Sequence, residues 1–169
     1  MILDLVDCDN RILKSPTSPF VFGGDKDPYE LTDTMFQTMY HNVGLGLSAN
    51  QIGIDASVFV MGYDHTAFEV FNPELVNITG RDVMMPEGCL SFPNCFLQVN
   101  RPGSIHVKFQ NKEGVWREEV YGGMTARIFL HEYDHMKGIT FDQKVSRMKW
   151  DMALKRKNKL DKKIQRSKI

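Results

Sequence analysis

The sequence predicts an α+β fold, with mostly antiparallel strands in the middle of the chain packed around a central helix, and a further helix at the C-terminus. Segments with helical periodicity lie near both ends of the chain, and β-branched and aromatic segments separated by turn residues lie between them. At 169 residues and 42% hydrophobic composition, the chain is long enough for one domain with a proper core. We expect residues 1–145 to form that domain and residues 146–169 to form a basic helix or tail.

The first expected helix covers residues 27–44, DPYELTDTMFQTMYHNVG. Asp27 is a suitable N-cap, and Pro28 suits the first helical position because the amide hydrogen it lacks would have no partner there. Gly44 is expected to end the helix, since glycine adopts the left-handed backbone conformation easily. Three apolar side chains then share one helix face: Leu31, Met35 and Met39.

Four strands are expected in the middle of the chain, where β-branched and aromatic residues are frequent. They are SVFVMG (57–62), AFEVFNP (67–73), SIHVKFQN (104–111) and VWREEVYG (115–122). The turn NKEG joins the last two strands as a hairpin. Two helices follow: one runs from Met124 to about Lys137, with Gly138 available to end it, and the other begins at about Val145.

The C-terminal part of the chain is strongly basic. Residues 144–169 carry eleven Lys or Arg against two Asp, while residues 1–143 carry ten against nineteen acids. The net charge is therefore +9 for residues 144–169 and −9 for residues 1–143, which sum to zero. A basic segment of this kind suits a polyanion such as RNA, and a solvated helix face is the alternative.

The sequence indicates neither a membrane anchor nor a signal peptide. No stretch approaches the roughly 18 consecutive apolar residues of a membrane span, and Asp4 interrupts the apolar N-terminus. The three cysteines follow no paired framework, which favours a reducing compartment. We expect the cytoplasm of a bacterium, or of a host cell if the protein is viral, with an organelle interior as the alternative.

The stretch HEYDHMKGITF, residues 131–141, predicts a metal site on the helix that begins near Met124. His131 and His135 lie four residues apart on one helix face, so both imidazoles can bind one ion. Glu132 lies beside them, where it can handle the proton of an activated water molecule. The alternative is that both histidines are ordinary polar residues of the core or the surface.

A catalytic site of this type needs a third protein ligand. Phe141 stands where a metzincin protease would have its third histidine, and no glutamate follows Glu132. Cys89 is favoured because, in the segment MPEGCLSFP, it follows a glycine and lies between two prolines, unlike an ordinary core cysteine. The preference for Cys89 over Cys95 is modest. The remaining candidates are Cys8, His41, His65, His106, Asp142, Asp151 and Asp161.

The segment GLGLSANQIG, residues 44–53, points to the same chemistry. Gly44 and Gly46 would let the backbone approach a substrate closely, and the Gln51 amide could donate to an oxyanion. The alternative is a glycine-rich turn after a helix, with Gln51 in solvent.

Together, these three segments resemble peptide deformylases, the metallohydrolases that remove the formyl group from the initiator methionine of nascent chains. That family carries G-φ-G-φ-A-A-x-Q, E-G-C-L-S and H-E-x-D-H in this order. The matching segments here are Gly44–Gln51, Glu87–Ser91 and His131–His135. The resemblance extends over roughly residues 1–145 and implies that these residues form a single catalytic domain. Phe96 stands where many relatives have an arginine, so peptide preference beyond methionine stays open.

The resemblance implies one divalent metal ion, Fe²⁺ in the cell with Zn²⁺, Ni²⁺ or Co²⁺ as alternatives. Glu132 would take a proton from water and pass it to the leaving amine. The Gln51 side chain and the backbone N–H of Leu90 would hold the oxyanion. The implied metal ligands are Cys89, His131 and His135.

The implied substrate is a formyl-Met nascent peptide, which would lie as an added strand along Gly46 and the backbone of Glu87 and Gly88. Asp134 is expected to pair with Arg101. The basic tail could contact the ribosome, and nothing in the sequence demands more than a monomer. The implied methionine pocket is built from Leu45, Met124, Ile128 and the His131 ring edge.

Two functions of other classes also remain open from the residues alone. One is a zincin-type endoprotease with a different third ligand, and the other is an RNA-binding module with a structural metal site.

Overall fold

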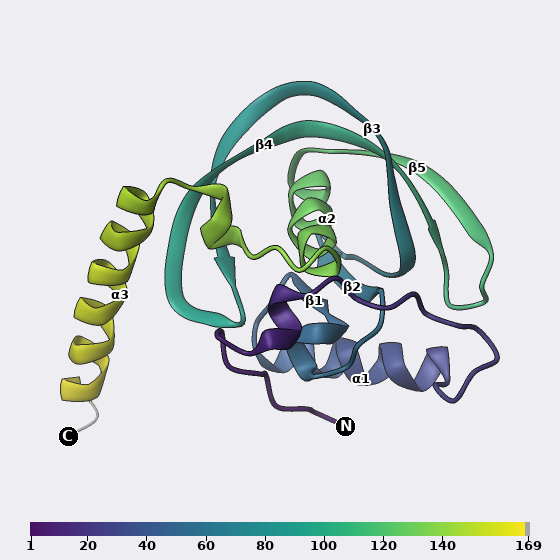
Figure 1. The fold of residues 1–169 in the computed structure, drawn as a ribbon, viewed down its shortest axis with the longest axis horizontal. Coiled ribbons are helices and arrows are strands. Elements are labelled where there is room, and N and C mark those ends of the chain that lie inside the picture. Colours follow the sequence, from purple (N-terminus) through teal and green to yellow (C-terminus); the bar gives the residue numbers. More distant parts are fainter. Residues whose placement is uncertain (168–169) are drawn as a thin grey trace.

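The computed structural model describes residues 1–167 and has the expected α+β architecture, with a five-stranded antiparallel sheet and three α-helices (Figure 1). Neighbouring strands in the sheet follow chain order: β1 (Gly46–Ser48), β2 (Val58–Tyr63), β3 (Thr66–Cys89), β4 (Phe92–Gln110) and β5 (Trp116–Gly122). The α-helices are α1 (Pro28–His41), α2 (Gly123–Met136) and α3 (Arg147–Ser167). Short 3-10 helices are η1 (Arg11–Lys14), η2 (Ala49–Ile52) and η3 (Phe141–Lys144).

Strand β2 is buried on both faces because α1 and α2 pack on opposite sides of it. Successive side chains of a strand point in opposite directions. Val58 and Val60 join the hydrophobic cluster that includes α1, whereas Phe59 and Met61 join the cluster that includes α2. Helix α2 thus lies in the middle of the molecule, inside the arch formed by β3, β4 and β5 (Figure 1).

Strands β3 and β4 are much longer than the expected strands at 67–73 and 104–111. They form a curved ribbon whose register shifts at four places (Figure 1). The glycines and prolines in these segments resemble turn signals, but the strands pass them at bulges and bends. A Cβ on Gly103, for example, would lie 2.9 Å from the carbonyl oxygen of Arg81, so the close approach of the two strands requires glycine. Strand β1 was not expected either.

Helix α1 begins as predicted, because the Asp27 side chain accepts hydrogen bonds from two amides of the first turn. Its end differs from the prediction. The left-handed conformation falls on Val43, with φ of 56°, and not on Gly44. Gly44 follows it and donates its backbone N–H to the carbonyl oxygen of Met39 at 2.9 Å. A Cβ on Gly44 would lie 2.7 Å from Cδ1 of Leu90, so that side chain would have to shift.

The predicted hairpin and the predicted end of α2 are both confirmed. Gly114, with φ of 76°, turns the chain between β4 and β5. Gly138, with φ of 70°, follows α2, and a Cβ there would collide with the backbone of Ser15. Both glycines adopt a positive φ that other residues adopt with difficulty, and at Gly138 there is also no room for a Cβ.

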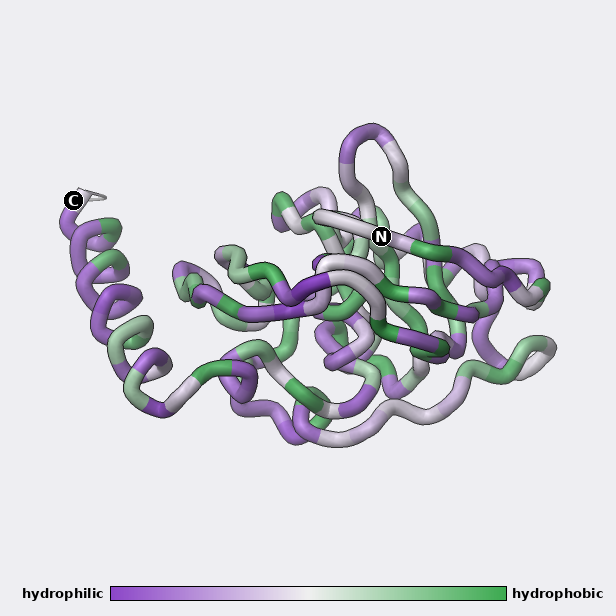
Figure 2. The backbone as a smooth tube through the Cα atoms, turned by 90° about the horizontal axis from the view of Figure 1, so that it is seen from above, coloured by the Kyte–Doolittle hydropathy of each residue, from purple (hydrophilic) through white to green (hydrophobic). Residues whose placement is uncertain are grey.

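Helix α3 is mostly hydrophilic and lies at one side of the molecule, where it packs against β4 (Figures 1 and 2). Ala153 is buried in the same hydrophobic cluster as Cys89. Asp161 accepts a 2.9 Å hydrogen bond from Asn94 and pairs with Lys157 at 2.5 Å. Within residues 1–167, no helix is long and apolar enough to cross a membrane.

Candidate metal centre

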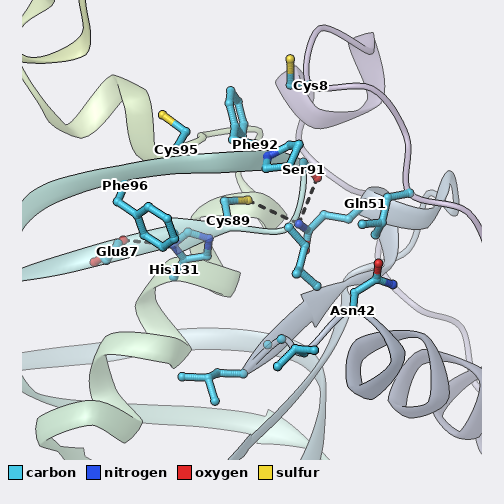
Figure 3. Close-up of a pocket in the computed structure, with 18 of the residues that line it drawn as sticks. Cys8, Asn42, Gln51, Glu87, Cys89, Ser91, Phe92, Cys95, Phe96 and His131 are labelled. Atoms are coloured by element: carbon cyan, nitrogen blue, oxygen red, sulfur yellow. Dashed lines mark hydrogen bonds and ion pairs between the residues drawn. The ribbon is translucent and has the colours of Figure 1, made fainter. Parts of the chain in front are cut away.

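Three potential metal ligands meet where β3 ends beside α2. The ligating atoms of Cys89, His131 and His135 all lie within 4.8 Å of one another, and the three side chains are buried. The Cys89 Sγ is 3.4 Å from Nε2 of His135. The helix repeat aligns the two histidines. Cys89, the last residue of β3, lies beside His131 (Figure 3).

The other candidates for a third ligand lie elsewhere. Cys95 belongs to the same buried cluster as Cys89, between the β3–β4 ribbon and α3, but it is not part of the group that could hold an ion. His41 and His65 are exposed, and His106 pairs with Glu118 at 2.7 Å. The structure therefore separates Cys89 from Cys95, which the sequence alone distinguished only weakly.

Glu87 orients the ring of His131. Its Oε2 lies 3.0 Å from Nδ1 of His131, which leaves Nε2 of that ring free for an ion. Arg101 reaches both carboxylate oxygens of Glu87, at 2.5 and 3.0 Å, and Arg127 reaches Oε1 at 2.8 Å. Burial alone would raise the pKa of Glu87, but the hydrogen bonds from His131 and Arg101 hold it well below its usual range.

The expected pair of Asp134 and Arg101 is confirmed, with Nη1 2.7 Å from Oδ2. Lys144 contacts the second carboxylate oxygen of Asp134 at 3.1 Å. Arg127 was missed by the sequence analysis, although it lies one helical turn before His131 and is the one basic residue between Met124 and that histidine. It donates to the carbonyl oxygens of Val83 and Val99 as well as to Glu87, and so ties α2 to β3 and β4. Nη1 of Arg127 donates to Glu87 and Val99, and Nη2 donates to Val83.

The amide of Gln51 is held in one orientation. Its oxygen accepts hydrogen bonds from the backbone and hydroxyl of Ser48, at 2.9 and 3.0 Å. The nitrogen therefore faces Ser91 Oγ at 3.0 Å and Cys89 Sγ at 3.4 Å (Figure 3). Asn50, which the sequence analysis did not select, donates to the carbonyl oxygen of His135 at 2.9 Å and fastens this loop to α2.

Glu132 is buried and faces Gly46 on β1. Within residues 1–167, its Oε2 has no hydrogen-bond partner. Burial raises the pKa of Glu132 to about 7, although the neighbouring charges of His131 and Arg101 act in the opposite direction. A buried carboxylate with a free oxygen and a pKa near neutrality is suited to proton transfer.

The site opens into a cavity of about 820 Å³. Every residue expected to bind substrate lines this cavity, together with Glu132, Gln51 and Leu90. The residues expected to bind substrate are Gly44, Leu45, Gly46, Glu87, Gly88, Met124 and Ile128. The Glu87 side chain itself is only 4% exposed, so its carboxylate serves the interior network.

The donor set fits a divalent transition metal. One thiolate and two imidazoles are three protein ligands, as in catalytic sites that leave a position for water. Burial lowers the pKa of His135 well below its usual value, so this ring is neutral, as a ligand must be. Burial would lower the pKa of His131 too, but the neighbouring Cys89 and Glu87 raise it to about 10. His131 would therefore release a proton on binding an ion.

A cysteine sulfur and two imidazoles beside a buried carboxylate, next to a cavity and on an antiparallel sheet wrapped around one helix, are the features of a metal-dependent hydrolase. The sequence matches the family model described as polypeptide deformylase over residues 2–150. The chain belongs to the polypeptide deformylase family. It is a hydrolase that removes the N-formyl group from the initiator methionine of nascent polypeptides and releases formate.

Relatives of known name agree with this assignment. The chain is 41% identical to the peptide deformylase of Thermotoga petrophila over 114 residues, which cover 68% of this chain and 70% of the relative. It is 35% identical to that of Bartonella tribocorum over 159 residues, covering 90% of this chain and 89% of the relative.

Solved structures of peptide deformylases superpose closely. The Synechococcus elongatus enzyme in complex with actinonin has a TM-score of 0.87 at 31% identity and covers 92% of this chain and 88% of its own. The Legionella pneumophila enzyme has a TM-score of 0.88 at 28% identity and covers 98% and 99%. The Met-Ala-Ser-bound enzyme of Acinetobacter baumannii has a TM-score of 0.82 at 29% identity and covers 86% and 99%.

Proposed function

We propose that Cys89, His131 and His135 hold one divalent metal ion and that deformylation takes place beside them. One observation carries this proposal: the three ligating atoms lie within 4.8 Å of one another, next to a cavity that Glu132 also lines. Glu87 keeps the His131 ring turned so that Nε2 is available.

In the proposed reaction, a bound ion and Glu132 have separate roles. A divalent ion there would supply Lewis acidity, polarising the formyl carbonyl and lowering the pKa of water. Glu132 accepts a proton from the attacking water as the water oxygen bonds to the formyl carbon. The same carboxyl group then donates that proton to the amine nitrogen as the C–N bond breaks, which releases formate and a free methionine amine.

The oxyanion would be held by two donors on opposite sides of the site. The Ser48 hydrogen bonds fix the Gln51 amide, so its nitrogen already points at the reacting centre and needs no reorganisation. The backbone N–H of Leu90, in the turn between β3 and β4, is the second donor.

The formyl-methionyl peptide would lie along the cavity in extended form. Gly46 on β1 and the Glu87 and Gly88 backbone offer it two strand edges. The methionine side chain would enter the apolar end of the cavity, and the Acinetobacter relative was solved with Met-Ala-Ser bound. The pocket residues are Leu45, Met124, Ile128 and the edge of the His131 ring.

Release of formate from formyl-Met-Ala-Ser by the metal-loaded protein tests this assignment. Glu132→Ala should slow release by about 10²- to 10⁴-fold while the metal content stays at one ion per chain. Intact formyl-Met peptide after incubation with the metal-loaded wild-type protein would refute the proposal. Cleavage of casein that survives Cys89→Ala would indicate a protease instead.

We propose Fe²⁺ as the ion in the cell. A thiolate with two imidazoles does not select strongly among Fe²⁺, Zn²⁺, Ni²⁺ and Co²⁺, so the available metal decides. Anaerobic purification followed by elemental analysis tests this, and activity that falls on exposure to air would support iron. Equal activity with zinc, unaffected by air, would contradict it.

We also propose that residues 1–145 form the catalytic domain and that residues 146–169 contact the ribosome. The charge of +9 on residues 144–169 suits RNA, with an expected salt-dependent affinity. Cosedimentation with ribosomes, lost on truncation after residue 161, would support this role. The protein would then act as a monomer in the cytoplasm.

A further inference from the structure

Asn50, the residue before Gln51, is completely buried and uses its whole side-chain amide. Its nitrogen donates to the carbonyl oxygens of His135 at 2.9 Å and Ile12 at 3.4 Å. Its oxygen accepts a hydrogen bond from the hydroxyl of Ser48 at 2.8 Å. An asparagine amide has two hydrogens to donate and an oxygen that accepts, so each polar atom of this side chain has a partner and the amide has one orientation.

These contacts join separate parts of the chain beside the candidate metal centre. Ile12 lies in η1, Ser48 ends β1, and His135 lies in the last turn of α2. Asn50 itself lies in η2, where the next residue is Gln51. The proposed oxyanion donor and a proposed metal ligand are therefore connected through one buried side chain.

The two polar side chains in this connection are not part of the motif that the chain shares with its family. In G-φ-G-φ-A-A-x-Q, Ser48 stands at the first alanine and Asn50 at the variable position. The backbone N–H of Ser48, 2.9 Å from Oε1 of Gln51, would be available with any residue there except proline. The Ser48 hydroxyl and the Asn50 amide add a fixed position relative to α2.

The position of the Gln51 amide matters for its proposed role. Its nitrogen lies 3.0 Å from Ser91 Oγ and 3.4 Å from Cys89 Sγ, so it faces the candidate metal centre (Figure 3). An oxyanion donor stabilises a transition state only at hydrogen-bond distance from the developing charge, and a displacement of about 1 Å costs on the order of 100-fold in rate. A loop tied to α2 keeps that distance constant, since α2 carries His131 and His135.

We propose that Asn50 is a positioning residue for deformylation, which, together with the Ser48 hydroxyl, fixes the Gln51 amide relative to α2. The inference rests on the proposed function of the site. Asn50 does not line the substrate cavity, so it acts through Gln51 and not on the substrate. Its replacement should therefore lower kcat, because Gln51 is misplaced in the transition state, and leave KM nearly unchanged.

Formate release from formyl-Met-Ala-Ser by the metal-loaded protein tests the inference. Asn50→Ala should lower kcat by about 5- to 50-fold and change KM by less than about twofold. The metal content, measured by elemental analysis, should stay at one ion per chain. In a Gln51→Ala background, Asn50→Ala should cost less than about threefold in kcat, since the group that it positions is then absent.

Asn72→Ala is the matched control, because Asn72 makes the same kinds of contact outside the substrate cavity. Its nitrogen donates to the carbonyl oxygen of Phe20 at 3.0 Å and to Gln110 at 2.8 Å, and its oxygen accepts from the backbone N–H of Phe20 at 2.7 Å. Both substitutions should lower Tm, since each leaves polar groups without a partner. Only Asn50→Ala should lower kcat when the assay is run well below both melting temperatures.

Wild-type kcat in Asn50→Ala, or the same loss of kcat with and without Gln51, would overturn the inference. An equal fall in kcat in Asn72→Ala would overturn it as well. If Asn50→Ala does not fold, Ser48→Ala decides, because it removes the hydroxyl and keeps the backbone N–H; kcat should fall by about twofold to fivefold, and an unchanged kcat would overturn the inference. Absence of formate release by the wild-type protein would instead refute the proposed function.

Discussion

Replacing Gly46 by alanine would place a methyl group against the side chain of Glu132. A Cβ at this position would lie 2.8 Å from Cδ and 2.9 Å from Cγ of Glu132, and its carboxylate oxygen is closer still. Ordinary contacts begin near 3.4 Å, so the carboxylate group must move by more than half an ångström. Glu132 is only 3% exposed, and the buried surroundings restrict where it can go.

The effect of this displacement on the rate can be bounded. A misplacement of about 1 Å costs on the order of 100-fold in rate. We therefore expect Gly46→Ala to lower kcat by roughly 10- to 100-fold, equivalent to about 1.4–2.7 kcal/mol. The three metal ligands are not touched, so the metal content should stay at one ion per chain.

The assay is formate release from formyl-Met-Ala-Ser, measured beside elemental analysis and a thermal melt. Gly62→Ala is the matched control on the neighbouring strand β2, because a Cβ there meets its nearest atom, the hydroxyl of Tyr40, at an ordinary 3.4 Å. Gly46→Ala in the Glu132→Ala background should cost little further activity, since the group it displaces is already gone. Wild-type kcat in Gly46→Ala, or fully additive losses in the double variant, would refute the reasoning.

Three further outcomes are expected. Glu132→Ala should reduce kcat by about 10²- to 10⁴-fold with metal retained, and loss of the metal would indicate a ligand role instead. Arg101→Met leaves the carboxylates of Glu87 and Asp134 buried with fewer partners, so the free energy of unfolding measured in urea should fall by about 3 kcal/mol. As a control, Arg147→Met removes only an exposed ion pair and should change that free energy by less than about 0.5 kcal/mol. Chelation should abolish activity and lower Tm, and added Fe²⁺ should restore both, because the ion binds only the native state.

The parts of the fold that could be predicted from the sequence are those with local signals. Asp27 and Pro28 mark the start of α1, and Gly138 marks the end of α2, because capping depends on neighbouring residues. The lengths of β3 and β4 could not be predicted. Their extension depends on cross-strand pairing between residues far apart in sequence, and bulges carry the strands past their glycines and prolines.

In the site, helical periodicity predicts the alignment of His131 and His135, since both lie on one element. The third ligand depends on tertiary structure. Cys89 and Cys95 differ by six positions and share one buried cluster, and only the β3–β4 turn decides which thiol lies beside the two histidines. Arg127 has a weaker local signal, a charged residue one turn before His131, but its partners on β3 and β4 follow only from the packing.

The two buried glutamates beside the proposed metal site differ in a way that supports the proposed division of their roles. Both carboxylate oxygens of Glu87 have hydrogen-bond partners, which are Arg101, Arg127 and His131. These partners hold the pKa of Glu87 well below the usual range. It cannot accept a proton near neutral pH. Glu132 has a free oxygen within residues 1–167, and burial raises its pKa to about 7. Two carboxylates whose pKa values are driven apart by their surroundings are typical of a site in which one orients and the other transfers protons. Here the orienting carboxylate fixes the ring of a proposed metal ligand, and the other lines the substrate cavity.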